Sequence, residues 1–294
     1  MNKQLYLGIA EDNGVSMAIL GDGKGNVLGR RLGRSFDYQR LGKEQARANL
    51  YSLVHSMHDF RGSLRLHTVS LAVPLRAAYQ AEEFFGLVHS VVDTSFIRLY
   101  SFSEAAMCGM RGKKPEILLL TDNKGSLLFR RDGRHFTKPM PGGGAMDVVK
   151  KALNYVELYP SEFGVSELQE CLTEWWVDPC KSRAGYIVTE IERLADTGNL
   201  PALKIMSHAA HSMIKATAAA IEVLDRQNPL IGLCGSVALG SRSVQRKFCN
   251  VIRWLFPKSR IEAAAHAPAK GAYLSSLVPQ VEEQKNHKQV FSTV

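Results

Sequence analysis

The chain has 294 residues, a formal net charge of +9 and a hydrophobic content of 45%. That length suffices for two domains of about 150 residues each, and the ordinary mixture of apolar and charged residues excludes a disordered or fibrous chain. The longest apolar runs, such as residues 117–120, are far shorter than the roughly 20 residues that span a bilayer. Since no leader-like segment opens the sequence either, we expect a cytoplasmic protein.

Strands and helices alternate in the first part of the chain. Runs of β-forming residues predict three strands separated by tight turns, at residues 4–10, 15–20 and 27–32. After a helix at residues 43–57 with apolar residues at helical spacing, strands and helices follow in turn, at residues 64–73, 77–88, 95–100 and 103–110. Such alternation indicates parallel pairing of strands.

The pattern starts again about 110 residues later and then becomes mainly helical. Three more strands are predicted at residues 116–121, 125–131 and 135–138. Six helices and two short strands follow, the helices at residues 146–158, 165–175, 182–196, 200–225, 243–254 and 267–278 and the strands at 230–234 and 260–263. We expect an N-terminal lobe at 1–114, a C-terminal lobe at 115–278 whose last helix returns toward the first lobe, and a flexible tail at 279–294.

Charge and cysteine content argue against two kinds of site. The basic residues gather beside predicted turns, at residues 30–34, 111–114 and 130–134. Exposed charge is usual at turns, so no nucleic-acid partner is expected. The five cysteines form no CxxC pair, so we expect reduced, mostly buried thiols rather than disulfides or a zinc site.

Five segments share their order and pattern with one known family. They are a strand and hairpin at 6–29, S-F-S-E-A-A-M-C-G at 101–109, a strand and turn at 116–126, L-I-G-L-C-G-S-V-A at 230–238 and A-P-A-K-G-A-Y-L at 267–274. Together they resemble the N-acetylglucosamine kinase-like and BadF/BadG/BcrA/BcrD-type ATPase family of the sugar kinase, Hsp70 and actin superfamily. The resemblance spans roughly residues 4–278 and implies an α/β fold of two ribonuclease-H-like lobes around a central cleft (the actin-like ATPase or ASKHA fold), with extra helices in the second lobe.

The first phosphate turn of the family departs from its pattern here. Ala10 stands where the resemblance places the aspartate that orders Mg²⁺, so Glu11 or Asp12 would have to replace it, with Asp12 as the metal ligand. Asn13 and Gly14 would contact phosphate in a turn that keeps one of three glycines. The alternative is an ordinary polar hairpin.

Glu104 stands at the family's catalytic aspartate, so the resemblance implies that it is the general base. Alternatively, it stabilises the start of a short helix through the helix dipole. The second phosphate turn, residues 121–126, is also open to two alignments. In one, Lys124, Gly125 and Ser126 contact phosphate; in the other, no glycine remains in the turn and Asp122 repels ATP.

The remaining site residues follow from the resemblance alone. The sugar would lie beside Gly142, Gly143 and Gly144, although the D-E-G-S segment that follows in the family is missing. The adenosine side would be formed by Gly235, Ser236, Val237 and Ala238. Of the two adjacent glycines that the family has there, this chain keeps Gly235, and Ser236 replaces the second. A tight strand-to-helix turn would need the same glycine.

Two functions therefore remain open. An active protein would be a divergent amino-sugar kinase or ATPase, with ATP and Mg²⁺ as cofactors and a nucleotide and a sugar as ligands. The eroded motifs favour equally a catalytically inactive pseudokinase that binds or scaffolds a protein partner. The resemblance implies a homodimer in either case, and we expect no association with a membrane.

Overall fold

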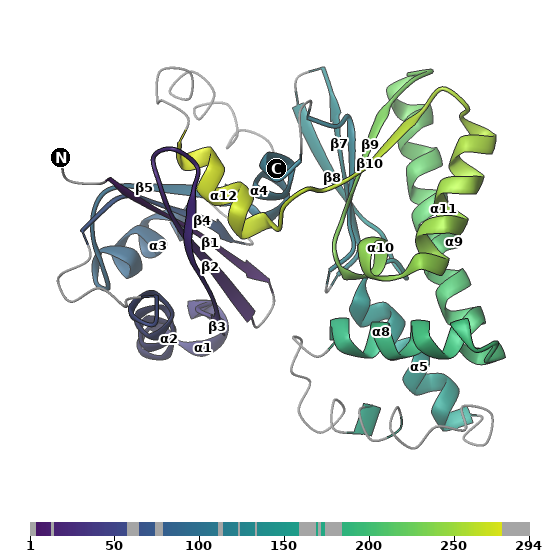
Figure 1. Ribbon diagram of the computed structural model, residues 1–294, viewed down its shortest axis with the longest axis horizontal. Coiled ribbons are helices and arrows are strands. Elements are labelled where there is room, and N and C mark those ends of the chain that lie inside the picture. Colours follow the sequence, from purple (N-terminus) through teal and green to yellow (C-terminus); the bar gives the residue numbers. More distant parts are fainter. Residues whose placement is uncertain are drawn as a thin grey trace. The chain divides into compact units, whose positions relative to one another are not determined.

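The computed structural model describes residues 4–12, 15–57, 65–73, 79–110, 114–122, 124–132, 134–158, 169, 172–173 and 184–277. The chain divides into two compact units, which are coloured along the sequence in Figure 1. The first unit contains residues up to 109 and those from 266 onward, and the second contains residues 110–265. No helix in the described ranges is long and apolar enough to cross a membrane. The lobe boundaries expected at 114/115 and 278/279 stay predictions.

The first unit is built on a five-stranded sheet in the order β3-β2-β1-β4-β5. Its strands are β1 (Leu5–Asp12), β2 (Val15–Asp22), β3 (Val27–Arg34), β4 (Arg65–Val73) and β5 (Asp93–Ser101). The first three form an antiparallel meander, whereas β1, β4 and β5 run parallel. This confirms the parallel pairing predicted from the alternation of strands and helices.

Helices cover both faces of this sheet, which explains the apolar alternation of β1. Leu7 and Ile9 face a core formed with α2 (Lys43–His55) and α3 (Tyr79–His89). Tyr6 and Ala10 face the opposite layer, formed by α4 (Phe102–Cys108) and α12 (Pro268–Ser276). Figure 1 shows these helices around the strands of the first unit. A further short helix, α1 (Tyr38–Leu41), was not foreseen; the side chain of Asp37 caps it.

α12 packs very closely on the sheet because two strand glycines leave room for it. A Cβ atom on Gly8 would lie 2.3 Å from the backbone nitrogen of Tyr273, and one on Gly21 would lie 2.3 Å from the Tyr273 ring. The Tyr273 hydroxyl donates to the Asp22 carbonyl at 2.7 Å. A helix from the end of the described chain therefore completes the first unit.

The second unit repeats the topology of the first. Its sheet has the order β10-β9-β6-β7-β8, with an antiparallel meander β6-β7-β8 and parallel pairing of β6, β9 and β10. The strands are β6 (Ile117–Leu120), β7 (Ser126–Arg131), β8 (Arg134–Pro139), β9 (Leu230–Cys234) and β10 (Arg260–Ala263). The repeated meander predicted from the sequence is thereby confirmed.

The extra helices of the second unit share one apolar core with its sheet. They are α5 (Ala145–Leu158), α8 (Ala184–Asp196), α9 (Leu200–Leu224), α10 (Ser236–Gly240) and α11 (Arg242–Leu255). α10 was not foreseen, because five residues are too few for a periodic apolar pattern. The predicted helix at 165–175 and the tail at 279–294 lie outside the described residues, apart from a few isolated positions of the former.

Candidate functional site

The end of β1 carries the carboxylates expected near Mg²⁺. Glu11 is buried, and its Oε1 accepts a hydrogen bond from the hydroxyl of Ser35 at 2.7 Å. The Ser35 carbonyl accepts in turn from the amide of Asn49 on α2. Glu11 thus links the sheet to the segment that leads into the helices. Asp12 is the last residue of β1, while Asn13 and Gly14 lie outside the described residues.

Glu104 lies at the start of α4 and takes part in a reciprocal capping box. Its Oε2 accepts hydrogen bonds from the backbone N–H and from the hydroxyl of Ser101, both at 2.8 Å. The Glu104 N–H donates back to the Ser101 oxygen at 3.2 Å. Its carboxylate therefore satisfies the helix terminus, as a glutamate at this capping position commonly does. β1, β4 and β5 run parallel, so their carboxyl ends lie on the same side of the sheet. Glu11 near the end of β1 and Glu104 just after β5 therefore both lie at that side.

In the second unit, hydrogen bonds join the residues that follow β6 to the first residues of α10. The Asp122 carboxylate accepts from the Ser236 N–H at 3.0 Å. The Val237 N–H donates to the Thr121 carbonyl at 3.3 Å, and the Ala238 N–H donates to the Thr121 hydroxyl oxygen at 2.8 Å. The three amide donors at this helix start, which would otherwise suit an anion, therefore all have partners within the chain.

Gly235 permits this contact between the two loops. Its φ of +105° lies in a region that favours glycine, and a Cβ atom there would come within 2.6 Å of the Asp122 nitrogen. The glycine kept from the adenosine motif consequently has a structural reason that needs no nucleotide.

The second predicted phosphate turn packs against the glycine segment that follows β8. Lys124 is exposed, and Ser126 begins β7 opposite Leu120. Gly125 is buried, and a Cβ atom there would lie 2.4 Å from the Met140 carbonyl oxygen. The Asp122 carbonyl also accepts from the N–H of Ala145. The turn is thus tied to the start of α5.

The amides of the glycine segment are also used internally. Asp147 Oδ2 accepts from the N–H groups of Gly142 and Gly144 at 3.0 and 3.3 Å, and the Gly143 N–H donates to the Met140 carbonyl. The structure therefore brings residues 121–122, 124–126, 142–145 and 235–238 together in one group of loops, which we call the second-unit loop cluster.

A cavity of about 500 Å³ opens beside Gly142. Besides Gly142 and Asp147, it is lined by residues of α5, namely Lys150, Lys151, Asn154, Tyr155 and Leu158. His208 of α9 lies against Gly142. Desolvation, with the charges of Lys151 and His211, holds the pKa of His208 below its usual value, while Asp147 acts in the opposite direction. The charged side chains that line the cavity are thus two lysines and one aspartate.

Sequence reasoning missed the α5 residues of this cavity and the role of Asp147. Lys150 and Asn154 are four residues apart and so lie on one helix face, but such a pair is equally usual on a solvated surface. Within the described ranges, no group of three or more His, Cys, Asp or Glu residues is arranged to hold a metal ion.

Comparison with known proteins supports the fold. No protein-family model matches the chain, and neither does any curated protein sequence. A ROK-family glucokinase from Streptomyces griseus, solved with glucose and AMPPNP, has a similar structure, with a TM-score of 0.62 and 14% identity over 92% of this chain and 98% of that one. The protein assigned as an N-acetylglucosamine kinase from Porphyromonas gingivalis gives a TM-score of 0.68 and 12% identity over 94% and 100%.

The same fold also occurs in a protein of another class. A ROK-family transcriptional regulator, a homologue of the Escherichia coli MLC protein, gives a TM-score of 0.59 and 10% identity over 94% of this chain and 79% of its own. Identities this low support the fold and leave the activity open. The chain thus has the two-lobed actin-like ATPase (ASKHA) fold that ROK-family and N-acetylglucosamine kinases share.

Proposed function

We propose that this protein is a catalytically inactive pseudokinase of the sugar-kinase fold that serves as a binding or scaffold module. The observation that carries the proposal is the hydrogen bond from the Ser236 N–H to the Asp122 carboxylate in the second-unit loop cluster. Phosphate loops work by offering backbone N–H groups to an anion. Here the donors are engaged, and the charge of Asp122 would repel a phosphate placed beside it.

The carboxylates of the first unit support the same proposal. A general base must come within hydrogen-bonding reach of the proton that it removes. Oε2 of Glu104 instead holds two hydrogen bonds from Ser101, and Oε1 of Glu11 holds the Ser35 hydroxyl. ATP and Mg²⁺ therefore fit the described residues poorly, and we derive no reaction step through them.

Thermal unfolding with Mg-ATP and a panel of amino sugars tests the proposal. A ligand at 100 times its dissociation constant would stabilise the protein by about 2.7 kcal/mol and raise the unfolding midpoint by about 2–4 °C in a chain of this size. We expect no shift with any combination, and no sugar phosphate by mass spectrometry. A nucleotide-dependent shift that a sugar enlarges, together with a phosphorylated product, would contradict the proposal.

A second candidate is an ATP-dependent kinase that acts on an amino sugar or a related small molecule. The cavity beside Gly142 favours it, since its volume of about 500 Å³ suits a small ligand. In this case Glu104 is the base, Glu11 or Asp12 organises Mg²⁺, and the second-unit loop cluster contacts the nucleotide after rearrangement. The variant Glu104→Gln should then abolish turnover and leave sugar binding in place.

The assembly and family branch belong to the proposal as well. A cytoplasmic homodimer of the BadF/BadG-related branch is expected for either function. Light scattering at micromolar concentration would measure the mass, and a value of one chain would contradict the dimer.

A further inference from the structure

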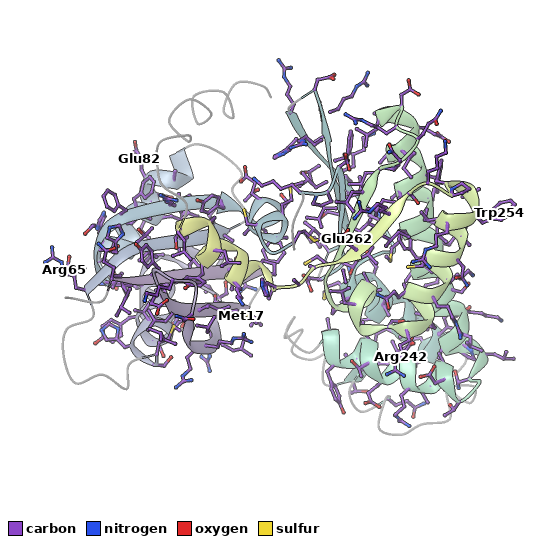
Figure 2. The ribbon with its side chains drawn as sticks, turned by 45° about the horizontal axis from the view of Figure 1, so that its top comes forward. Met17, Arg65, Glu82, Arg242, Trp254 and Glu262 are labelled. Atoms are coloured by element: carbon purple, nitrogen blue, oxygen red, sulfur yellow. The ribbon has the colours of Figure 1, made fainter. Side chains whose placement is uncertain are left out.

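The second unit carries a groove that neither function uses. It has a volume of about 710 Å³ and lies between α11 and the strands β9 and β10. Its lining includes Arg242, Arg246 and Arg253 of α11, with other polar residues of that helix, and the apolar residues Leu233, Ile261 and Ala263 of the strands. Figure 2 shows Arg242 near one end of α11 and Trp254 near the other. We call this feature the arginine groove.

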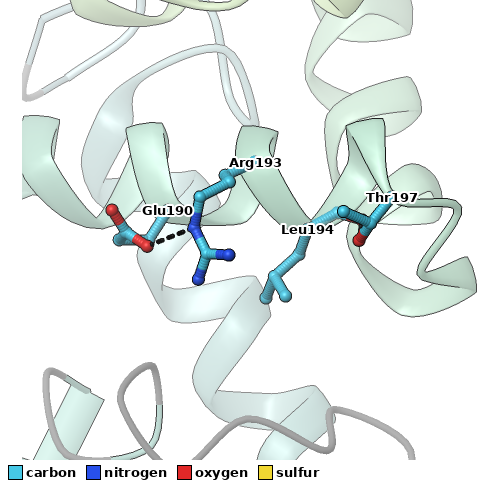
Figure 3. Close-up of polar contacts among 4 residues, drawn as sticks. All are labelled: Glu190, Arg193, Leu194 and Thr197. Carbon is cyan, nitrogen blue, oxygen red and sulfur yellow. Dashed lines mark hydrogen bonds and ion pairs between the residues drawn. The ribbon is translucent and has the colours of Figure 1, made fainter.

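The charge of the groove is not balanced by the described part of the chain. None of its three arginines forms an ion pair with a described residue. Arginines outside it do: Arg193 contacts Glu190 on α8 (Figure 3), and Arg260 contacts Glu262, both at 2.9 Å. Among the described residues that line the groove, only Asp196 is acidic. An arginine-rich wall of this kind suits carboxylates or phosphates.

The spacing of the arginines sets the length of the partner. Arg242, Arg246 and Arg253 recur after four and seven residues along one helix, so they rise by about 6 Å and then about 10 Å along its axis. A total of about 16 Å is the length of roughly five residues of an extended peptide, in which alternate side chains repeat every 6.6 Å or so. A small anion would reach only one or two of the arginines.

The lining favours a peptide over a nucleic acid. Single-stranded nucleic acids are usually held by aromatic side chains on which the bases stack. None of the described residues that line the arginine groove is aromatic, and those that the strands contribute are aliphatic. Aliphatic side chains are instead suited to contact the apolar residues of a strand-like peptide.

β10 offers backbone groups to such a peptide. It is the last strand of its sheet, and no strand of the described ranges pairs with its outer edge. On its inner side, the Arg260 N–H donates to Pro229 and the Ala264 N–H donates to Leu233. Because successive residues of a strand point their amides to opposite sides, those of Ile261 and Ala263 point toward the open edge, where an added strand could bind them.

We infer that the arginine groove binds an acidic segment of a partner protein, in extended conformation, alongside β10. Carboxylates of the segment contact the arginines of α11, and its apolar side chains contact Ile261 and Ala263. This site gives the proposed binding module a class of partner. It does not depend on the absence of phosphoryl transfer, and it is measured without nucleotide, so the two proposals can fail separately.

Fluorescence polarisation with a labelled octapeptide of alternating glutamate and valine tests the inference. We expect saturable binding that weakens as salt is raised, and none by the matched lysine–valine peptide. Reversing one groove charge with Arg246→Glu should weaken binding by about tenfold or more. Arg130→Glu is the matched control, because Arg130 is exposed on β7, which β6 and β9 separate from β10. It should leave the affinity unchanged.

Two further arms decide the nature of the partner. N-methylation of alternate peptide amides should remove binding if the segment pairs with β10, and unchanged affinity would overturn strand addition. A single-stranded oligonucleotide that binds more tightly than the peptide, and is weakened by Arg246→Glu, would overturn the inference in favour of nucleic acid. Equal loss in the Arg130→Glu control, or no peptide binding to the unaltered protein, would overturn it as well. Arg253→Glu repeats the groove test at a second exposed position.

Discussion

The carboxylate of Asp122 lies at the start of α10, where an anion could otherwise accept hydrogen bonds from the backbone. This carboxylate accepts the Ser236 N–H, so Asp122→Ala would leave this donor without its partner. We expect a loss of about 1–2 kcal/mol of unfolding free energy, measured by urea denaturation. Asp122→Asn is the control, because its amide oxygen still accepts the bond; it should retain most of the stability. Equal loss in both variants would mean that charge, and not the hydrogen bond, holds the loop.

Variants at Glu104 distinguish a structural role of this residue from a catalytic one. A glutamine at this capping position can still accept from Ser101, so Glu104→Gln should keep nearly all of the stability. Glu104→Ala should lose about 0.5–2 kcal/mol because the capping interaction is removed. Chemical denaturation of the three proteins measures both values. If the alanine variant is as stable as the unaltered chain, the capping box contributes nothing and the catalytic role gains weight.

At the scale of elements, the packing of α12 on the first sheet buries a group that titrates, the phenol of Tyr273. Burial, and then the nearby charge of Asp22, raises the pKa of the Tyr273 phenol. A pKa that is higher in the folded than in the unfolded chain contributes stability below the unfolded value, near 10, and this stability is lost as pH rises beyond it. We expect Tyr273→Phe to cost about 1 kcal/mol at pH 7 through loss of the bond to Asp22.

The difference between the two proteins should shrink above about pH 10, because only the unaltered chain carries this phenol. Thermal unfolding from pH 7 to 11 measures it. A constant difference across this range would show that the Tyr273 pKa is not raised.

At the scale of the whole molecule, the first unit depends on a segment distant in sequence. α12 supplies Ala269, Ala272 and Tyr273 to its core. A chain that ends after residue 265 should therefore lose the cooperative unfolding of the first unit, while the second, residues 110–265, keeps its own core. A chain that ends after residue 277 retains α12 and is the control. Hydrogen exchange of β1 and β6 peptides distinguishes the units, and equal protection of β1 in both chains would contradict this dependence.

The order of elements could be predicted from sequence because each depends on neighbouring residues. Runs of β-forming residues marked β1 and β4, and helical patterns marked α2, α9 and α11, within a few residues of their observed bounds. The short helices α1 and α10 escaped because each has less than two turns. The sequence also predicted Glu104 at the start of a short helix, and the structure adds its capping partner Ser101, three residues away.

By itself, the sequence determined that two similar strand meanders occur, where helices follow them, and that the expected phosphate turns keep few of the family's glycines. Only the tertiary structure decided what those turns do instead. Asp122 and Ser236 are 114 positions apart, and Tyr273 and Asp22 are 251 apart, so no local pattern records either contact. Local periodicity specifies elements, whereas the partner of a carboxylate depends on which loops the folded sheet brings together.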